Sequence, residues 1–276
     1  EYANIGELEL IQSKTRSVSA LNAATRKQVR DRNRENLTIG GQKVPIDGAP
    51  WVVSIVRNHQ LICAGSLLTN DVVLTAASCI KAVEPAELLV RGGTTAFKNS
   101  GKLRRIKETI HHPKYVEGSH AYNVALLHLL RPFNHTDDHV GQVKLPDVDS
   151  TLPSAINIFG WGLSSNKTNV IMTKNLRFTK TKIYSDKKCA QYLTEEEEDT
   201  DYIFCSGDRT KISDICTDDP GSAAIFNDNV QFGVVSDGGA CSETRTTILT
   251  NLAKHTRWIK NLLNEFEREN KNNKTH

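Results

Sequence analysis

Cysteine and asparagine residues carry the most specific chemical signals in this chain of 276 residues. The six cysteines are even in number and none stands in a Cys-x-x-Cys pair, which favours disulfide bonds and leaves fifteen pairings open. Four Asn-x-Ser/Thr triplets, the acceptors of N-linked glycans, begin at Asn36, Asn134, Asn166 and Asn273. Together these signals predict a secreted, extracellular glycoprotein whose signal peptide has been removed.

Histidine and acidic residues could also bind metal ions. His111, His112 and His120 could form a metal site, and six carboxylates within residues 195–201 could bind calcium or a basic partner. Histidines in turns or at the surface and a self-repelling, solvated loop are the simpler interpretations, because the acidic run lacks the Asx–Gly spacing of a calcium loop. We therefore expect no metal and no cofactor.

Basic residues form two groups that could contact a polyanion. The groups are Lys102, Arg104, Arg105 and Lys107, and then Lys174, Arg177, Lys180, Lys182, Lys187 and Lys188. The outward side of an ordinary strand would look the same. The formal net charge of +3 is too small to indicate a nucleic-acid partner. No apolar run reaches eighteen residues, so we expect no membrane span.

Short apolar runs separated by turn residues dominate the middle of the chain. Trp51–Val56 and Leu61–Leu68 flank a polar turn, which is the pattern of strand, turn and strand. Similar runs rich in β-branched residues are Val72–Leu74, Leu88–Arg91, Val124–Leu130, Ile156–Phe159, Leu176–Ile183 and Val230–Val235. They predict an all-β fold. Only Ala253–Phe266 shows helical spacing of its apolar residues, which predicts one closing helix.

Both ends of the chain are polar. Residues 1–37 lack Cys, Pro, Trp and Phe and include a run of alternating charge, which predicts a polar N-terminal tail or pro-segment. Residues 264–276 are expected to form a polar C-terminal tail that frays. Residues 38–263 then form the folded domain.

Six segments of that domain resemble motifs of the trypsin-type serine endopeptidase family, and they stand in the family's order. The family motifs are Ile-Val-Gly-Gly, Leu-Thr-Ala-Ala-His-Cys, Asp-Ile-Ala-Leu-Leu, Gly-Trp-Gly, a segment ending Gly-Asp-Ser-Gly-Gly-Pro, and a closing helix. The matching segments are Thr38–Gly41, Leu74–Cys79, Asn123–Leu127, Gly160–Gly162, Asp214–Ala223 and Arg257–Ile259. One match would be weak, whereas six in order over residues 38–263 are strong evidence of descent.

The resemblance implies two packed six-stranded antiparallel β-barrels with a C-terminal α-helix, the first barrel ending near residue 146. It also selects one of the fifteen disulfide pairings, namely Cys63–Cys79, Cys189–Cys205 and Cys216–Cys241. In the chain-entropy model each of these bonds contributes about 3 kcal/mol to stability.

The positions of the family's catalytic triad hold residues that cannot perform its chemistry. The resemblance places Ser78 at the imidazole base, Asn123 at the carboxylate and Pro220 at the nucleophile. A hydroxyl cannot act as a base near neutral pH, and a neutral amide cannot stabilise an imidazolium. Proline has neither a hydroxyl nor an N–H group. Asp218, at the position of an oxyanion-binding glycine, would bring negative charge to the place where an oxyanion must form.

The substrate-binding positions resemble those of the family more closely than the catalytic positions do. The resemblance places Asp214 at the floor of a pocket for Arg or Lys side chains, and Ser236 and Gly238 on the strand that pairs with substrate. Asp237 and Thr247 replace a pocket-wall tryptophan and a pocket-lining glycine. Because Thr247 should narrow the cavity, we expect a residual or blocked pocket.

Asp219 matches the zymogen-activation carboxylate, which receives the new N-terminal ammonium when zymogens of the family are cut. The matching cut would fall between Leu37 and Thr38, a bond that no Arg- or Lys-directed protease would choose. We therefore expect the protein to keep its tail and a zymogen-like state. Ser222 could replace the missing nucleophile only beside an imidazole, and none of the nine histidines stands at a motif position that would supply one.

The sequence thus predicts a secreted, catalytically inactive homologue of these proteases, similar to inactive homologues of arthropod secretions. Such a protein would bind an active protease or its substrate as a cofactor, decoy or regulator. Two alternatives stay open. One is a residual or unconventional endopeptidase, and the other is an adhesion protein that binds glycans or matrix through its basic strands.

Overall fold

The computed structural model describes residues 42–272 except residues 82, 99, 137, 167–168, 173–174, 195–198, 208–218, 228 and 238–245, and only the backbone of residues 163–166 and 169–172. The chain divides into two units, residues 1–40 and 41–276, and every described residue belongs to the second. The predicted N-terminal tail, residues 1–37, therefore lies outside the described residues.

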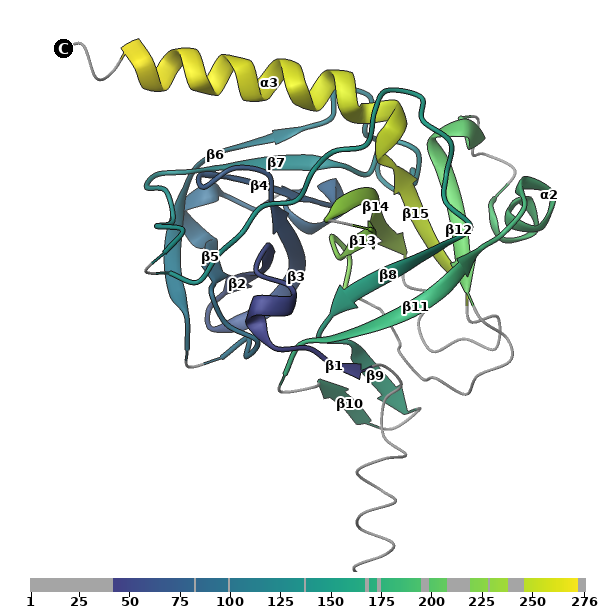
Figure 1. Ribbon diagram of the computed structural model, residues 1–276, viewed down its shortest axis with the longest axis horizontal. Helices are drawn as coiled ribbons and strands as arrows, with labels where there is room; N and C mark the ends of the chain where they lie inside the picture. Colours follow the sequence, from purple (N-terminus) through teal and green to yellow (C-terminus); the bar gives the residue numbers. More distant parts are fainter. Residues whose placement is uncertain are drawn as a thin grey trace, which may run out of the picture. The chain divides into compact units, whose positions relative to one another are not determined.

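Six antiparallel strands close the first barrel in the order β2-β3-β4-β7-β6-β5 (Figure 1). Their bounds are β2 Val52–Arg57, β3 Gln60–Leu67, β4 Val72–Thr75, β5 Leu89–Gly92, β6 Lys102–His111 and β7 Ala125–Leu129. The barrel closes because β2 pairs with β5 as well as with β3. Fully buried aliphatic side chains such as Val53, Leu67, Leu74, Val90 and Leu126 fill its core.

The second barrel closes in the same way, because β8 pairs with both β11 and β13. The six strands are β8 Ala155–Gly160, β11 Arg177–Ile183, β12 Ile203–Gly207, β13 Ala223–Phe226, β14 Val230–Asp237 and β15 Thr247–Asn251. The short strand β1, Gln42–Lys43, pairs with β11 outside the closed ring, and β9, Leu163–Asn166, forms a separate hairpin with β10, Asn169–Met172. The predicted all-β fold of two packed six-stranded barrels is confirmed.

Strand β6 shows why some strands are hard to predict from apolar runs. It reads Lys-Leu-Arg-Arg-Ile-Lys-Glu-Thr-Ile-His, and of its side chains only Ile106 is buried. The first basic group lies on β6 of the first barrel, whereas Arg177, Lys180 and Lys182 lie on β11 of the second. Lys187 and Lys188 lie on the short helix α2, Asp186–Cys189, and Lys174 lies outside the described residues. The two basic groups therefore lie on different barrels.

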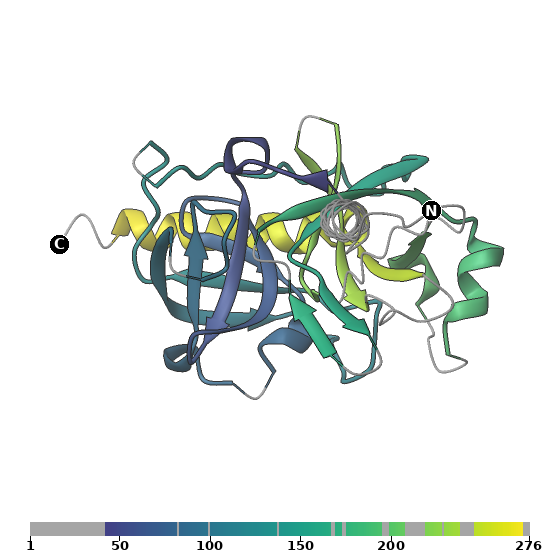
Figure 2. The ribbon, with the colours of Figure 1, turned by 90° about the horizontal axis from the view of Figure 1, so that it is seen from below.

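The C-terminal helix α3 extends from Leu252 to Asn272, alongside the first barrel (Figures 1 and 2). The predicted helix is confirmed, but the C-terminal tail predicted from residue 264 is helical as far as residue 272. The extension has partners on the barrel: the buried ring of Phe266 lies 4.3 Å from that of His128, and Asn270 Nδ2 donates to Asp71 Oδ2 at 3.1 Å. Within the described part of the chain, no helix combines the length and the apolar character that crossing a membrane requires.

Two of the three expected disulfides are confirmed. Cys63 of β3 is bonded to Cys79, and Cys189 of α2 is bonded to Cys205 of β12. The third expected bond, Cys216–Cys241, lies outside the described residues.

Two histidines are packed among aromatic rings below the start of α3. The ring of His112 lies 4.9 Å from the rings of both Tyr122 and His255, and 4.7 Å from that of Trp258. His255 Nε2 donates to the carbonyl oxygen of Ala121 at 2.8 Å. Burial lowers the pKa of His112 and of His255 to about 4 in each case. Both imidazoles are therefore neutral in the folded protein at pH 7.

We predict that replacing His255 with glutamine makes the protein less sensitive to acid. The unfolded chain binds a proton at His255 near pH 6.5, whereas the folded chain does so only near pH 4, so stability is lost as the pH falls between these values. At about 1.36 kcal/mol per pK unit, this loss amounts to about 3 kcal/mol. The free energy of unfolding in urea should therefore fall less between pH 7 and pH 4 in His255→Gln than in the wild type, by about 3 kcal/mol. The control His59→Asn, at an exposed histidine, should behave like the wild type, and an unchanged loss in His255→Gln would refute the assignment.

Candidate functional site

Strand pairing brings the first two triad positions together. Strands β4 and β7 are antiparallel with Thr75 opposite Ala125, so the residues that follow β4 lie beside those that precede β7. Ser78 stands on the 3-10 turn Ala77–Cys79 just after β4, held by the disulfide of Cys79, and Asn123 stands two residues before β7. Ser78 is exposed, and Asn123 is 4% exposed.

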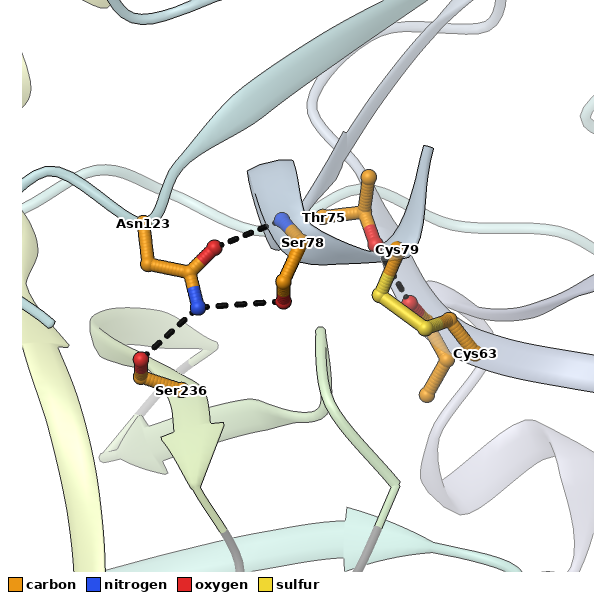
Figure 3. Close-up of a disulfide and its surroundings, with 7 residues drawn as sticks. Cys63, Thr75, Ser78, Cys79, Asn123 and Ser236 are labelled. Carbon is orange, nitrogen blue, oxygen red and sulfur yellow. Dashed lines mark hydrogen bonds between the residues drawn. A yellow bond between two sulfur atoms is a disulfide. The ribbon is translucent and has the colours of Figure 1, made fainter. Parts of the chain in front are cut away.

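The Asn123 amide links these two positions to the second barrel (Figure 3). Asn123 Oδ1 accepts the backbone N–H of Ser78 at 2.8 Å, while Asn123 Nδ2 donates to Ser78 Oγ at 3.1 Å and to Ser236 Oγ at 2.8 Å. A backbone N–H can only donate, so the amide oxygen must face Ser78 N and the amide nitrogen must face the two hydroxyls. The network is neutral throughout.

Ser236, near the end of β14, also contacts an imidazole. His120 Nδ1 lies 2.8 Å from Ser236 Oγ. The direction of this hydrogen bond depends on the tautomer of His120, because Ser236 Oγ can accept a second hydrogen bond besides that from Asn123 or can donate its own proton. The motif positions gave no indication of this contact, although His120 precedes Asn123 by only three residues, which is the signal that could have revealed it.

The turn at the nucleophile position has its backbone groups engaged inside the protein. The carbonyl oxygen of Pro220 accepts Ala64 N–H at 3.0 Å, Gly221 N–H donates to the carbonyl of Val235 at 2.9 Å, and Ser222 N–H donates to that of Asp219 at 3.1 Å. Pro220 itself has no N–H. Gly221 has φ +84°, and a Cβ there would collide with the carbonyl oxygen of Ala64, so the turn is pressed against β3.

Asp219 is buried at 2% exposure and is held by the Gly-Trp-Gly segment. Its Oδ2 accepts the N–H of Trp161 at 2.5 Å and that of Gly162 at 2.8 Å. A Cβ on Gly160 would lie 2.8 Å from the same oxygen, so glycine is required there. Burial raises the pKa of Asp219, against the two N–H bonds, which lower it.

Ser222 is not placed to act as a nucleophile. It is 1% exposed, and its Oγ finds no hydrogen-bond partner among the described residues. It packs below Gly160, whose added Cβ would lie 2.9 Å from the hydroxyl oxygen.

The positions that correspond to the family's substrate pocket are described only in part. Asp214 and Gly238 lie outside the described residues, as does the oxyanion position Asp218. Thr247, at the start of β15, is 6% exposed and opposes Ser206 of β12. Asp237, the last residue of β14, is exposed.

The remaining predicted sites are distributed as follows. His112 is packed among aromatic rings and His120 contacts Ser236, and His111 does not join them in a cluster of metal ligands among the described residues. Of the sequons, Asn134 is exposed, Asn166 is described by its backbone alone in β9, and Asn36 and Asn273 lie outside the described residues. Residues 195–198 of the acidic run also lie outside them.

Comparisons with known proteins agree with this architecture. The family model described as Trypsin matches residues 38–259. Trypsin 5G1 of Aedes aegypti is 30% identical over 226 residues, covering 80% of this chain and 83% of that protein, and Tonin of Rattus norvegicus is 28% identical over 242 residues, covering 82% and 90%.

Solved structures show the same fold. A scabies mite inactivated protease paralogue, S-D1, superposes with a TM-score of 0.70 at 23% identity, covering 82% of this chain and 97% of that chain. Mouse neuropsin gives a TM-score of 0.69 at 24% identity, covering 82% and 99%.

We predict that Asp219→Asn and Asp219→Ala differ sharply in stability. Asparagine keeps an acceptor for both N–H groups and removes a buried charge. The free energy of unfolding at pH 7 should therefore fall by less than about 1 kcal/mol, or rise. Alanine leaves the N–H groups of Trp161 and Gly162 buried without an acceptor and should cost about 2–4 kcal/mol. Chemical denaturation of both variants measures the difference.

Asparagine as damaging as alanine would contradict this account. It would mean that the carboxylate has a cationic partner, such as the ammonium of a cleaved chain. Because burial raises its pKa, the carboxyl group favours the folded state most at low pH, and that contribution is lost as the pH rises through the raised pKa. Asp219→Asn should remove this loss.

Proposed function

Because this chain belongs to the trypsin family of serine proteases, while its catalytic positions hold Ser78, Asn123 and Pro220, we propose that it is a secreted, non-catalytic member that acts by binding other proteins. It serves as a cofactor, decoy or regulator of proteolysis. Its partner is an active protease or the substrate of one. It needs no cofactor for this role.

The observation that carries the proposal is the turn at Pro220. Acyl transfer requires a nucleophile and two N–H donors that are free to bind the oxyanion. Pro220 supplies neither a hydroxyl nor an N–H group, and the N–H groups of the next two residues, Gly221 and Ser222, do not replace its missing donor because they bind carbonyls of the protein itself. Since Ala64 N–H also binds the carbonyl of Pro220, the turn is held in this arrangement from outside.

The neutral Asn123 network supports the same conclusion. In serine proteases, replacing the triad carboxylate with an amide lowers kcat by about 10⁴. Here the amide also holds two hydroxyls and a backbone N–H, and Ser78 offers no group that takes up a proton near neutral pH. The position of the base is therefore filled by a hydrogen-bond partner of Asn123.

A residual endopeptidase is the second candidate, and the Ser236–His120 contact favours it. Its distance of 2.8 Å suits a serine and its base. However, Ser236 is 8% exposed and its Oγ already accepts a hydrogen bond from Asn123, which weakens its nucleophilicity and limits the access of a carbonyl carbon. We therefore rank this activity below protein binding.

Secretion and glycosylation fit the described residues. The two disulfides are typical of oxidising compartments, and Asn134 is exposed. An adhesion role through a polyanion is less favoured, because the basic groups lie on different barrels and Arg104 and Lys107 are paired with Asp138 and Glu269.

We predict that the purified protein does not turn over Arg- or Lys-amide peptides above a mock-purified control. The triple variant Ser78→His, Asn123→Asp, Pro220→Ser should stay at least about 100-fold below an active relative, because Asp218 still stands at the sequence position of an oxyanion-binding glycine and the pocket positions are altered. High turnover by the triple variant would show that the substitutions at the oxyanion and pocket positions have little effect on catalysis. Turnover by the wild type that is lost in Ser236→Ala would instead establish the residual endopeptidase.

We also predict that the protein, used as bait in the secretion that contains it, retains a protease or a protease substrate. Adding the purified bait should then change the rate of that protease at stoichiometric concentration. Retention of heparin-like polyanions above physiological salt, with no effect on any protease, would favour the adhesion role.

A further inference from the structure

Three metal-ligating side chains converge at the place where α3 crosses the first barrel. Glu108 of β6, His128 of β7 and Glu269 of α3 each offer one ligand atom, and these atoms all lie within 4.8 Å of one another. Glu108 and His128 are directly opposite in the pairing of β6 with β7. This cluster belongs to neither the former catalytic centre nor the substrate pocket.

His128 has a hydrogen-bonded carboxylate at one ring nitrogen and a more distant carboxylate near the other. Its Nδ1 lies 2.9 Å from Glu108 Oε1, and its Nε2 lies 3.9 Å from Asp71 Oδ2. The residue is 2% exposed, and the ring of Phe266 packs against it at 4.3 Å. An imidazole with one nitrogen towards ligand carboxylates and the other towards a further carboxylate is the arrangement that orients histidine ligands in zinc sites.

The two glutamates already converge on one cation. Lys107 Nζ lies 3.4 Å from Glu108 Oε1 and 3.1 Å from Glu269 Oε2. Both ion pairs are largely exposed, and pairs of this kind are worth about 0–1 kcal/mol. The ammonium is therefore a weakly held occupant that a stronger ligand could displace.

We propose that Glu108, His128 and Glu269 bind a Zn²⁺ ion in place of the Lys107 ammonium. The imidazole lone pair at Nδ1 and one oxygen from each glutamate become ligands, and water completes a four-coordinate site. The proton of His128 then resides on Nε2, the nitrogen that lies 3.9 Å from Asp71 Oδ2.

The required movement is small and falls on an exposed residue. Zinc–ligand bonds of about 2.0–2.2 Å place tetrahedral ligand atoms about 3.3 Å apart, so the present spacing must contract by up to about 1.5 Å. Glu269 is exposed near the end of α3 and can supply this shift. One imidazole among the three ligands favours Zn²⁺ over Ca²⁺, which prefers six to eight oxygen ligands.

Zinc bound here would cross-link the extended end of α3 to strands β6 and β7. Its expected effect is on the stability of the protein rather than on peptide hydrolysis. The proposal does not rest on the proposed function and can fail or succeed independently of it.

The test uses the full-length protein, freed of metal and titrated with Zn²⁺ and then separately with Ca²⁺, by calorimetry and thermal unfolding. Zn²⁺ should bind and raise the unfolding temperature, and Ca²⁺ should do neither. Glu269→Gln should raise the Kd for Zn²⁺ at least about tenfold. The matched control Glu267→Gln, on the same helix and paired with Lys271 at 3.9 Å, should leave that Kd unchanged. Lys107→Met, which removes the competitor, should lower it by up to about fivefold.

Glu269→Gln also removes the ion pair with Lys107, which alone could change stability. For each variant we therefore compare the rise in unfolding temperature on adding Zn²⁺, because this difference excludes the effect of the lost ion pair. Absence of Zn²⁺ binding in the wild type would overturn the proposal. Zn²⁺ binding that is unchanged in Glu269→Gln would overturn it as well, since the metal would then be held by histidines elsewhere.

Discussion

The hydrogen bonds of the Asn123 amide are the interaction on which the arrangement of the triad positions depends. The amide joins a turn of the first barrel, through Ser78, to a strand of the second, through Ser236. The orientation of the amide is fixed by the backbone N–H of Ser78, which needs an acceptor, and both amide hydrogens are then directed at hydroxyl oxygens. The centre is thereby held together without a formal charge, in a place where the family's chemistry requires an ion pair.

Internal hydrogen bonds also hold the neighbouring turn at residues 220–222. Pro220, Gly221 and Ser222 direct their backbone groups to Ala64, Val235 and Asp219, so the segment is a well-bonded part of the barrel interface. Asp219 is the charged group of this region that is deeply buried, and two N–H groups of the Gly-Trp-Gly segment bind it. The family's scaffold is kept, and the backbone groups of this turn contribute to it.

Much of the scaffold could be predicted from sequence because its signals are local. Apolar runs indicated β2, β3 and β8, and ordered motifs implied the pairing of Cys63 with Cys79. The charged strand β6 could not be predicted this way, because a barrel strand with one buried side chain lacks an apolar run. The helical extension after residue 264 could not be predicted either, because its partners Asp71 and His128 lie far away in the sequence. The contact between His120 and Ser236, 116 residues apart, likewise depends on the docking of two barrels.

Active-site titration tests the central claim most directly. The full-length protein is incubated with excess fluorophosphonate at neutral pH and its intact mass is then measured, with an active trypsin as the positive control. The proposed absence of a working nucleophile, base and oxyanion site predicts an unchanged mass. A gain of one phosphonyl group that maps to a single serine, Ser236 included, would contradict the account.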